Sequence, residues 1–198
     1  MNEAPVRAKI QALVIGGSAG VVGALLQILP GLPKNYPLAV MIVVHLPPDC
    51  DSTLASLLNN RCQIPVKEAE DKELIRPGIA YLAPPNYHLL VEPDFHLSLS
   101  QEEPVHFSRP SIDVLFESAS DAYGDSLAGV ILTGASSDGA RGLRAVCESG
   151  GLAFVQTLES AEASTMPRAA RASCPAARMM DLAQLAVTLQ TEFSPSLS

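Results

Sequence analysis

Apolar segments rich in β-branched residues recur along the chain, separated by stretches with helical spacing. These segments are Ala12 to Ile15, Val40 to Val44, Gly129 to Leu132 and Leu152 to Val155. Each is apolar throughout, without the polar alternation of a half-exposed strand, and this is typical of parallel strands covered on both faces. The pattern predicts a doubly wound α/β fold with a mostly parallel sheet and helices on both faces.

Helical spacing of apolar positions marks the stretches between and after these segments. The predicted helices are Val21 to Leu29, Thr53 to Asn59, Ile112 to Ala122, Ala140 to Glu148, Met166 to Ala172 and Leu182 to Thr191. Several begin beside Ser, Asp or Thr, which favour the N-terminus of a helix. Between about Ile64 and Leu99, short β-prone pieces alternate with proline-containing turns. This segment predicts a short antiparallel hairpin insertion and not a second domain.

Length and hydropathy favour one domain. The 198 residues are 47% hydrophobic, which is enough for one sizeable core and short for two. We expect a single domain over residues 1–198 with its core at about 9–193. Apolar runs fall far short of a bilayer span, and the chain lacks a basic-then-apolar leader, so we expect a cytoplasmic protein without membrane insertion.

Charge and cysteine content narrow the function classes. A formal net charge of -8 argues against a nucleic-acid partner, because phosphate binding needs a surplus of Lys and Arg. The cysteines are Cys50, Cys62, Cys147 and Cys174. They contain no Cys-x-x-Cys pair and no regular spacing, so we expect reduced thiols. His88, His96 and His106 have no metal-ligand spacing and are expected to be structural or solvated. No metal and no cofactor are expected.

Ser18 lies in Gly16-Gly17-Ser18-Ala19-Gly20, between the first predicted strand and the first predicted helix. Glycines on both sides allow a tight turn and leave the hydroxyl open, as around the nucleophile of an esterase. The same pattern fits a plain strand-to-helix turn. A dinucleotide-binding turn is a weaker alternative, because Gly-x-Gly-x-x-Gly is absent and no acidic residue ends the second strand. A reactive serine needs a base, and the base needs an orienting group. The presence or absence of these two partners therefore decides between an esterase nucleophile and a plain turn.

His45 and Asp138 follow two other predicted strands. His45 ends the second strand segment before Leu46-Pro47-Pro48, and Asp138 follows the third segment just before a helix. Because ligands bind beyond the carboxyl ends of parallel strands, both side chains are expected at the same edge as Ser18. A structural histidine and a helix-capping aspartate are the alternatives. Together the three residues have the chemistry of acyl transfer, with Asp138 accepting the Nδ1 proton of His45.

Motifs along nearly the whole chain are shared with one family. They are Val14 to Gly20, Val43 to Pro47, Tyr81 to Leu89, Ser108 to Phe116, Leu132 to Gly139 and Ala161 to Ala170. In these segments the chain closely resembles the catalytic domain of chemotaxis protein-glutamate methylesterases of the CheB type. The resemblance implies a doubly wound α/β domain that acts on the cytoplasmic domain of methyl-accepting chemotaxis receptors. The implied reactions are hydrolysis of glutamyl methyl esters, releasing methanol, and in many members deamidation of receptor glutamines.

The resemblance also implies roles for individual residues. Ser18 is the nucleophile, His45 the general base and acid, Asp138 the orienting group, and the backbone N–H of Ala19 an oxyanion donor. Family members commonly carry Thr at the place of Ala19 and Met at the place of Ala135, a second position expected to line the substrate site. These two departures keep an alternative open, namely a catalytically weakened receptor-binding or scaffold module.

Two further expectations concern regulation and docking. The familiar architecture places a receiver domain ahead of the esterase, whereas about a dozen residues precede the first predicted strand here. We therefore expect constitutive activity or control by a separate response-regulator receiver chain. Arg109 is expected to contact the receptor or to brace the next helix. Arg141, grouped with Arg144, Arg168 and Arg171, is expected either to face an acidic receptor helix or to form a solvated helix face.

Overall fold

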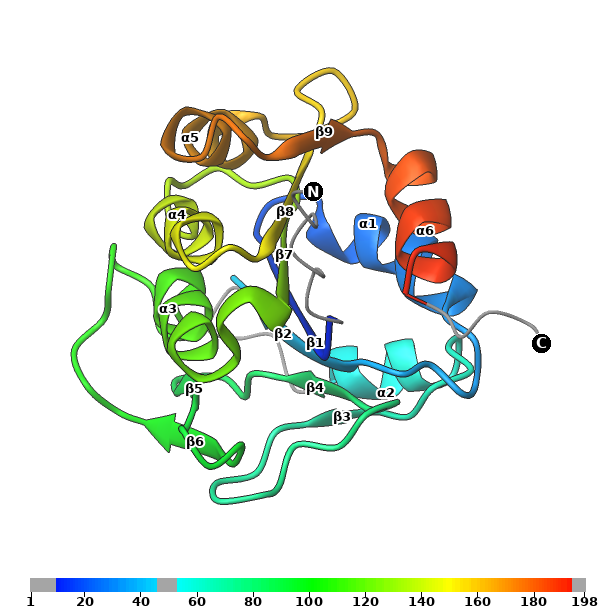
Figure 1. Ribbon diagram of the computed structural model, residues 1–198, viewed down its shortest axis with the longest axis vertical. Helices are drawn as coiled ribbons and strands as arrows, with labels where there is room; N and C mark the ends of the chain where they lie inside the picture. Colours follow the sequence, from blue (N-terminus) through cyan, green and yellow to red (C-terminus); the bar gives the residue numbers. More distant parts are fainter. Residues whose placement is uncertain (1–9, 46–52, 194–198) are drawn as a thin grey trace, which may run out of the picture.

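The computed structural model describes residues 10–45 and 53–193. Within these ranges seven strands, all parallel, form one sheet in the order β3-β4-β2-β1-β7-β8-β9 (Figure 1). The strands are β1 (Ala12–Gly17), β2 (Ala39–Val44), β3 (Val66–Glu68), β4 (Ala80–Leu82), β7 (Leu127–Ile131), β8 (Leu152–Gln156) and β9 (Arg178–Met180). Every residue of β1, β2, β7 and β8 is buried, as their unbroken apolar sequences predict.

Helices cover both faces of this sheet (Figure 1). One face carries α1 (Val21–Ile28), α2 (Thr53–Asn59) and α6 (Leu182–Thr191), and the other carries α3 (Ile112–Tyr123), α4 (Ala140–Glu148) and α5 (Thr165–Ser173). Short 3₁₀ turns, Leu29–Gly31 and Gly124–Ser126, follow α1 and α3. Successive residues of β1 belong alternately to the two cores, because strand side chains point to opposite faces. The predicted doubly wound α/β class is confirmed.

The antiparallel part of the fold is smaller than the sequence predicts. A hairpin of β5 (His88–Val91) and β6 (Leu97–Ser100) packs against α3. The prediction is wrong for the first half of this insertion, because β3 and β4 pair in parallel and β4 pairs with β2 in the main sheet. All three residues of β4 are buried. A solvent-facing hairpin would not bury them, whereas a position inside a covered sheet does.

The strand order brings distant parts of the sequence to one edge. β1 lies between β2 and β7, with Gly17 opposite Val44 and Gly16 opposite Ile131. The chain leaves β1 toward β2 and later returns to β7 on the other side of β1, which makes a topological switch point. In open α/β sheets ligands bind in the crevice at such a point, beyond the carboxyl ends of the strands.

A disulfide joins Cys147 of α4 to Cys174, which directly follows α5. The expectation of reduced thiols is therefore wrong for this pair. α4 and α5 pack side by side on one face of the sheet, and this brings together two cysteines that are 27 positions apart. Cys62 is a free thiol, and Cys50 lies outside the described residues.

In the described part of the chain, no helix has the length and apolar character that a membrane crossing requires.

Candidate active site

Ser18 begins the turn between β1 and α1, and Thr133 holds both sides of it. The backbone N–H of Ser18 donates to the carbonyl of Thr133 at 2.9 Å. The Thr133 hydroxyl donates to the carbonyl of Ala19 at 2.8 Å. At the start of α1, the N–H of Val21 donates to the carbonyl of Ser18 at 2.9 Å. Ser18 is half-buried at the head of the helix, and its backbone is fixed by the loop that follows β7.

The loop after β7 approaches Ser18 so closely that a side chain at position 134 would displace its neighbours. A Cβ on Gly134 would lie 3.0 Å from the Cβ of Ser18 and 2.8 Å from the sulfur of Met166. The N–H of Gly134 donates to the carbonyl of Ala163, and its own carbonyl accepts from the N–H of Met166, each at 2.9 Å. The buried Met166 side chain is therefore held against the backbone next to Ser18.

His45 lies at the same edge of the sheet as Ser18. Its backbone N–H donates to the carbonyl of Gly17 at 3.1 Å, so Ser18 and His45 directly follow residues that are paired in neighbouring strands. The His45 side chain is 13% exposed, and its Nε2 lies 2.8 Å from Oδ2 of Asp138. The prolines expected to end the strand after His45, Leu46-Pro47-Pro48, lie outside the described residues.

The ring nitrogen that meets Asp138 differs from the predicted one. The predicted hydrogen bond used Nδ1 of His45, whereas the observed one uses Nε2. Which nitrogen faces the carboxylate depends on the ring orientation, which the sequence pattern does not encode. The structure thus pairs His45 with Asp138 and leaves Nδ1 as the nitrogen for another partner. Among the described residues, no hydrogen bond joins the Ser18 hydroxyl to His45.

Asp138 is fully buried and accepts hydrogen bonds on both oxygens. Oδ1 accepts from the Ser111 hydroxyl at 2.8 Å and from the backbone N–H of Asp113 at 3.0 Å. Oδ2 accepts from the backbone N–H of Ile112 at 2.7 Å in addition to His45. Burial by itself raises the pKa of Asp138, but the hydrogen bonds from His45 and from the two N–H groups outweigh it and lower the pKa. The carboxylate is therefore ionised at neutral pH.

The alternative in which Asp138 caps the helix that follows it is wrong, because Asp138 caps a different helix. Asp138 precedes α4, yet its carboxylate accepts from the first N–H groups of α3. In return, Oδ1 of Asp113 in α3 accepts from the N–H groups of Gly139 and Gly142 at the start of α4, at 3.0 and 2.7 Å. Asp113 is fully buried, and burial is the main cause that raises its pKa. Asp138 thus accepts from the start of α3 and Asp113 from the start of α4, which links α3 to α4 next to His45.

Ala19 and Ala135, the two tentative oxyanion or substrate-binding positions, are both exposed. Ala19 directly follows Ser18, and Ala135 follows Gly134, whose backbone approaches Ser18. Within the described residues, no backbone carbonyl accepts from the N–H of Ala19. Ala19 directly precedes Gly20, the N-cap of α1, and the N-terminus of a helix favours negative charge.

A cavity of about 300 Å³ lies beside His45. Its walls come from the loop between β6 and α3, together with one residue that precedes β5. The lining residues are His45, Asn86, Pro104, Phe107, Ser108, Arg109 and Pro110. Ser18 is not among them, so the cavity reaches the His45–Asp138 pair from the side of this loop.

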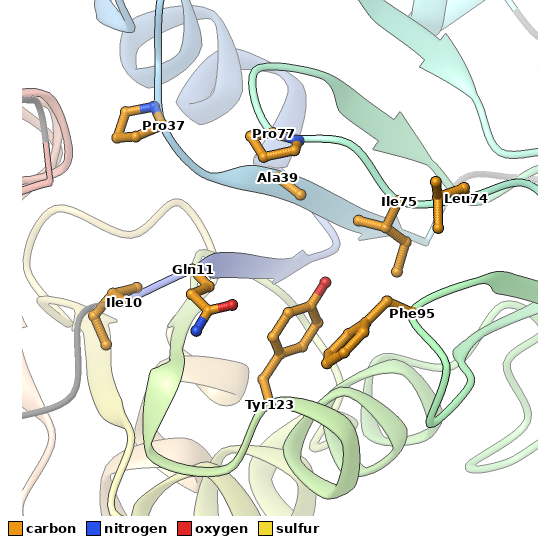
Figure 2. A pocket seen from close by; sticks show the side chains of 9 residues that line it. All are labelled: Ile10, Gln11, Pro37, Ala39, Leu74, Ile75, Pro77, Phe95 and Tyr123. Carbon is orange, nitrogen blue, oxygen red and sulfur yellow. The ribbon is translucent and has the colours of Figure 1, made fainter.

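A second, apolar pocket of about 420 Å³ lies at the other end of the sheet, and Figure 2 shows its lining. Gln11 and Ala39 stand at the start of β1 and β2, whereas Ser18 and His45 follow the ends of these strands. Six residues of extended chain span about 20 Å. The rings of Phe95 and Tyr123 contact each other in this pocket, with centroids 5.0 Å apart and a tilt of 47° between the ring planes. This pocket has no part in the candidate active site.

Two predicted receptor contacts have partners within the chain. Nη1 of Arg109 donates to the carbonyls of Gln101 and Glu102 at 2.9 and 3.1 Å, and so braces the loop that walls the cavity. Arg141 forms a bidentate pair with Glu117 of α3, with Nη2 donating to Oε2 at 3.1 Å. Arg109 thus bonds to the loop before it and not to the helix that follows, and Arg141 forms a second link between α3 and α4.

The three other histidines are structural or paired. His88 is buried, with Nδ1 accepting from the N–H of Ser111 and Nε2 donating to the carbonyl of Glu103, each at 3.1 Å. His96 pairs with Asp94 at 3.2 Å, and His106 lies 3.4 Å from Asp113. In residues 10–45 and 53–193, no group of three or more His, Cys, Asp or Glu side chains is arranged to hold a metal ion.

Sequence reasoning missed the residues that support the pair. Ser111, Asp113, Thr133 and Gly134 all lie inside motifs that the sequence analysis singled out, but none was assigned a role. Ser111 and Asp113 act through the packing of α3 beside α4, and Thr133 and Gly134 act through the approach of the loop after β7 to Ser18. Neither placement leaves a spacing signal in the sequence. Polar residues in otherwise apolar motifs, such as Ser111 and Asp113 before and within a buried helix, were the available signal.

Comparison with known proteins agrees with this architecture. A model of the CheB methylesterase family matches residues 13–189. A relative from Leptospira interrogans is 53% identical over 160 residues, covering 81% of this chain and 83% of that protein. The protein-glutamate methylesterase/protein-glutamine glutaminase of Halalkalibacterium halodurans is 44% identical over 161 residues, covering 80% of this chain and 46% of that protein. For the protein of the same name from Salmonella typhi, the identity is 36% over 197 residues, or 98% of this chain and 56% of that protein.

A solved structure has the same fold. The crystal structure of the Thermotoga maritima CheB methylesterase catalytic domain superposes with a TM-score of 0.86 at 30% identity, covering 92% of this chain and 98% of that one. The chain spans about half the length of the Halalkalibacterium and Salmonella proteins and most of the Leptospira relative. The family model alone covers most of the sequence. The chain belongs to the CheB methylesterase family.

Proposed function

We propose that this chain hydrolyses methyl esters of protein glutamyl side chains, with Ser18 as nucleophile, His45 as general base and acid, and Asp138 as the group that orients His45. The single observation that carries this proposal is the 2.8 Å hydrogen bond between His45 and the buried Asp138, at the edge where Ser18 leaves β1. The names of the relatives from Halalkalibacterium and Salmonella support the reaction class. The resemblance of the motifs points to the cytoplasmic domains of chemotaxis receptors as substrates.

Acylation starts when the Ser18 hydroxyl transfers its proton to Nδ1 of His45 and its oxygen attacks the ester carbonyl. The resulting oxyanion accepts a hydrogen bond from the backbone N–H of Ala19. The bond from the carbonyl carbon to the methoxy oxygen then breaks. Nδ1 of His45 gives its proton to the methoxy oxygen, methanol leaves, and the glutamyl group stays on Ser18.

Deacylation repeats these transfers with water. A water molecule gives a proton to Nδ1 of His45 and attacks the acyl carbon. The bond to the Ser18 oxygen breaks, and His45 returns the proton to that oxygen. The products are a glutamate side chain and free Ser18. An amide substrate follows the same route with ammonia as the leaving group, which is the deamidation that the names of the relatives describe.

Asp138 orients His45 and stabilises its positive charge in both steps. Its Oδ2 accepts from Nε2 of His45 and so fixes the tautomer in which Nδ1 carries the lone pair. Because its pKa is lowered, the carboxylate stays charged and faces the imidazolium that forms during each transfer. The backbone N–H groups of Ile112 and Asp113 keep this charge in place at the start of α3.

Methanol release from methylated receptor cytoplasmic fragments tests the proposed function. Wild-type protein is expected to release methanol, and Ser18→Ala is expected to lower the rate by about 10⁴-fold or more, because the covalent route is lost. Ser56→Ala, on the exposed face of α2, is the matched control and should keep wild-type turnover. Substantial methanol release by Ser18→Ala would overturn the assignment, and a folded wild-type chain that binds receptor without turnover would favour the scaffold alternative.

Control by a separate response-regulator receiver chain stays a prediction. Adding a receiver protein in trans should inhibit methanol release if a partner controls the site. Unchanged turnover with and without the receiver would favour constitutive activity.

A further inference from the structure

Phe107 projects into solvent at the rim of the cavity beside His45, since both residues line that cavity. Its exposed fraction is 103%, whereas Val187, the next most exposed large apolar residue in the described ranges, is 58% exposed. Single exposed apolar side chains are common on soluble proteins, so exposure alone assigns no role. The backbone that carries Phe107 gives the stronger indication.

Phe107 occupies the tip of a tight turn that disfavours its side chain. The N–H of Val105 donates to the carbonyl of Ser108 at 3.1 Å, and the N–H of Ser108 donates back at 2.9 Å. The two residues between them, His106 and Phe107, have φ angles of 50° and 62°. Two-residue turns with positive φ at both centres strongly favour Asn-Gly or Asp-Gly, because glycine has no Cβ to strain. This chain keeps a phenylalanine where glycine is the unstrained choice.

Neighbouring contacts hold this turn in place beside the candidate active site. Nε2 of His106 lies 3.4 Å from Oδ2 of Asp113, which has no hydrogen-bond partner in the described structure. The backbone N–H of Asp113 also donates to Asp138, the carboxylate that binds His45. At the base of the loop, Arg109 donates to two backbone carbonyls. The backbone that carries Phe107 is therefore linked to the residues that hold Asp138 and His45.

We propose that Phe107 is a docking residue for the apolar face of a helical protein substrate whose esterified glutamyl side chain reaches Ser18 past His45, from the side of this cavity. Side chains three or four residues apart on a helix lie about 5–6 Å apart at Cβ. A helix that presents its ester from this side therefore presents a second side chain, one turn away, to the rim. A small free ester has no such second contact. This inference rests on the proposed function and names the feature by which the site selects its substrate.

The test compares two substrates for each variant. One is a methylated receptor cytoplasmic fragment, followed by methanol release, and the other is p-nitrophenyl acetate. Phe107→Ala is expected to raise KM for the receptor fragment and to lower the ratio of kcat/KM values, receptor over small ester, by about tenfold, since one lost apolar contact costs about 10- to 200-fold. Phe107→Leu is expected to keep most of the wild-type ratio. Val187→Ala, an exposed apolar position on α6, is the matched control and should leave the ratio unchanged.

The outcomes separate this proposal from the proposed function. If wild type turns over the receptor fragment and Phe107→Ala has the wild-type ratio, the docking role is wrong while the esterase assignment stands. An equal loss on both substrates also contradicts docking, because it shows a disturbed site. If wild type releases no methanol from the fragment, the proposed function fails and the docking role fails with it. Because Phe107 is fully exposed, thermal unfolding of Phe107→Ala should match that of wild type.

Discussion

At the scale of single residues, Asp138 combines a structural role with the proposed chemical one. Its carboxylate accepts hydrogen bonds from the first N–H groups of α3 and from Nε2 of His45. The sequence pattern indicated Ser18, His45 and Asp138 as candidates because each is a polar residue directly after a buried strand or in the loop that follows one. The structure pairs His45 with Asp138 and places Ser18 at the same edge of the sheet as His45. The sequence pattern assigned the wrong nitrogen of His45, because the orientation of an imidazole depends on the carboxylate beneath it and not on the strand that carries it.

Asp138→Asn tests this dual role. An amide has only one oxygen, so its N–H₂ group takes the place either of Oδ2, facing His45 and the N–H of Ile112, or of Oδ1, facing the Ser111 hydroxyl and the N–H of Asp113. In the first placement Nε2 of His45 must accept, and the ring proton moves to Nδ1. We expect kcat for methanol release to fall by about 10⁴-fold, because His45 loses the tautomer that takes the Ser18 proton. Circular dichroism should show a folded protein. Asp121→Asn, an exposed residue of α3, serves as control and should keep wild-type kcat; wild-type kcat in Asp138→Asn would contradict the orienting role.

At the scale of elements, α3 and α4 are joined by exchanged carboxylates. Asp138 caps α3, while Asp113 of α3 caps α4. The helical spacing of the sequence predicted both helices within one residue at each end. It did not predict which acidic residue caps which helix, because a cap from another helix depends on tertiary packing. The same limit explains the missed disulfide between Cys147 and Cys174 and the misplaced β3 and β4.

Substitutions of Asp113 separate its hydrogen bonds from its charge. Asp113→Ala leaves the N–H groups of Gly139 and Gly142 without their acceptor and should lower the free energy of unfolding by about 2 kcal/mol. Asp113→Asn keeps an oxygen for both groups and removes a buried charge, so its stability should equal or exceed that of wild type. Urea unfolding at pH 7 measures both, with Asp121→Ala as the control on the same helix. Equal losses in the Ala and Asn variants would contradict the capping role.

At the scale of the whole molecule, the sheet order creates the site. β1 between β2 and β7 brings together residues 18, 45 and 138, and the unbroken apolar strands predicted this parallel sheet. The order of the strands and the loop that carries Phe107 were not predictable, because both depend on which elements pack together. The two buried carboxylates couple the stability of this assembly to pH.

Acid titration should reveal the opposite contributions of Asp138 and Asp113. The pKa of Asp138 is lowered in the fold, so its stabilisation is full above the ordinary pKa of about 3.9 and is lost as the pH falls through the lower value. The stability cost of Asp138→Asn should therefore shrink below about pH 4. The pKa of Asp113 is raised by burial, so any gain from Asp113→Asn should be largest at neutral pH and vanish in acid. Urea unfolding between pH 3 and 7 measures both differences, and pH-independent differences would contradict these assignments.

The reactivity of Ser18 toward a fluorophosphonate tests the central claim most directly. A phosphonyl adduct forms only on a hydroxyl whose proton a neighbouring base removes, so mass spectrometry of digested protein should locate the label on Ser18. His45→Ala should lower the rate of labelling by at least about 10²-fold. A folded wild-type protein that stays unlabelled at Ser18, or one that is labelled equally fast without His45, would contradict the account.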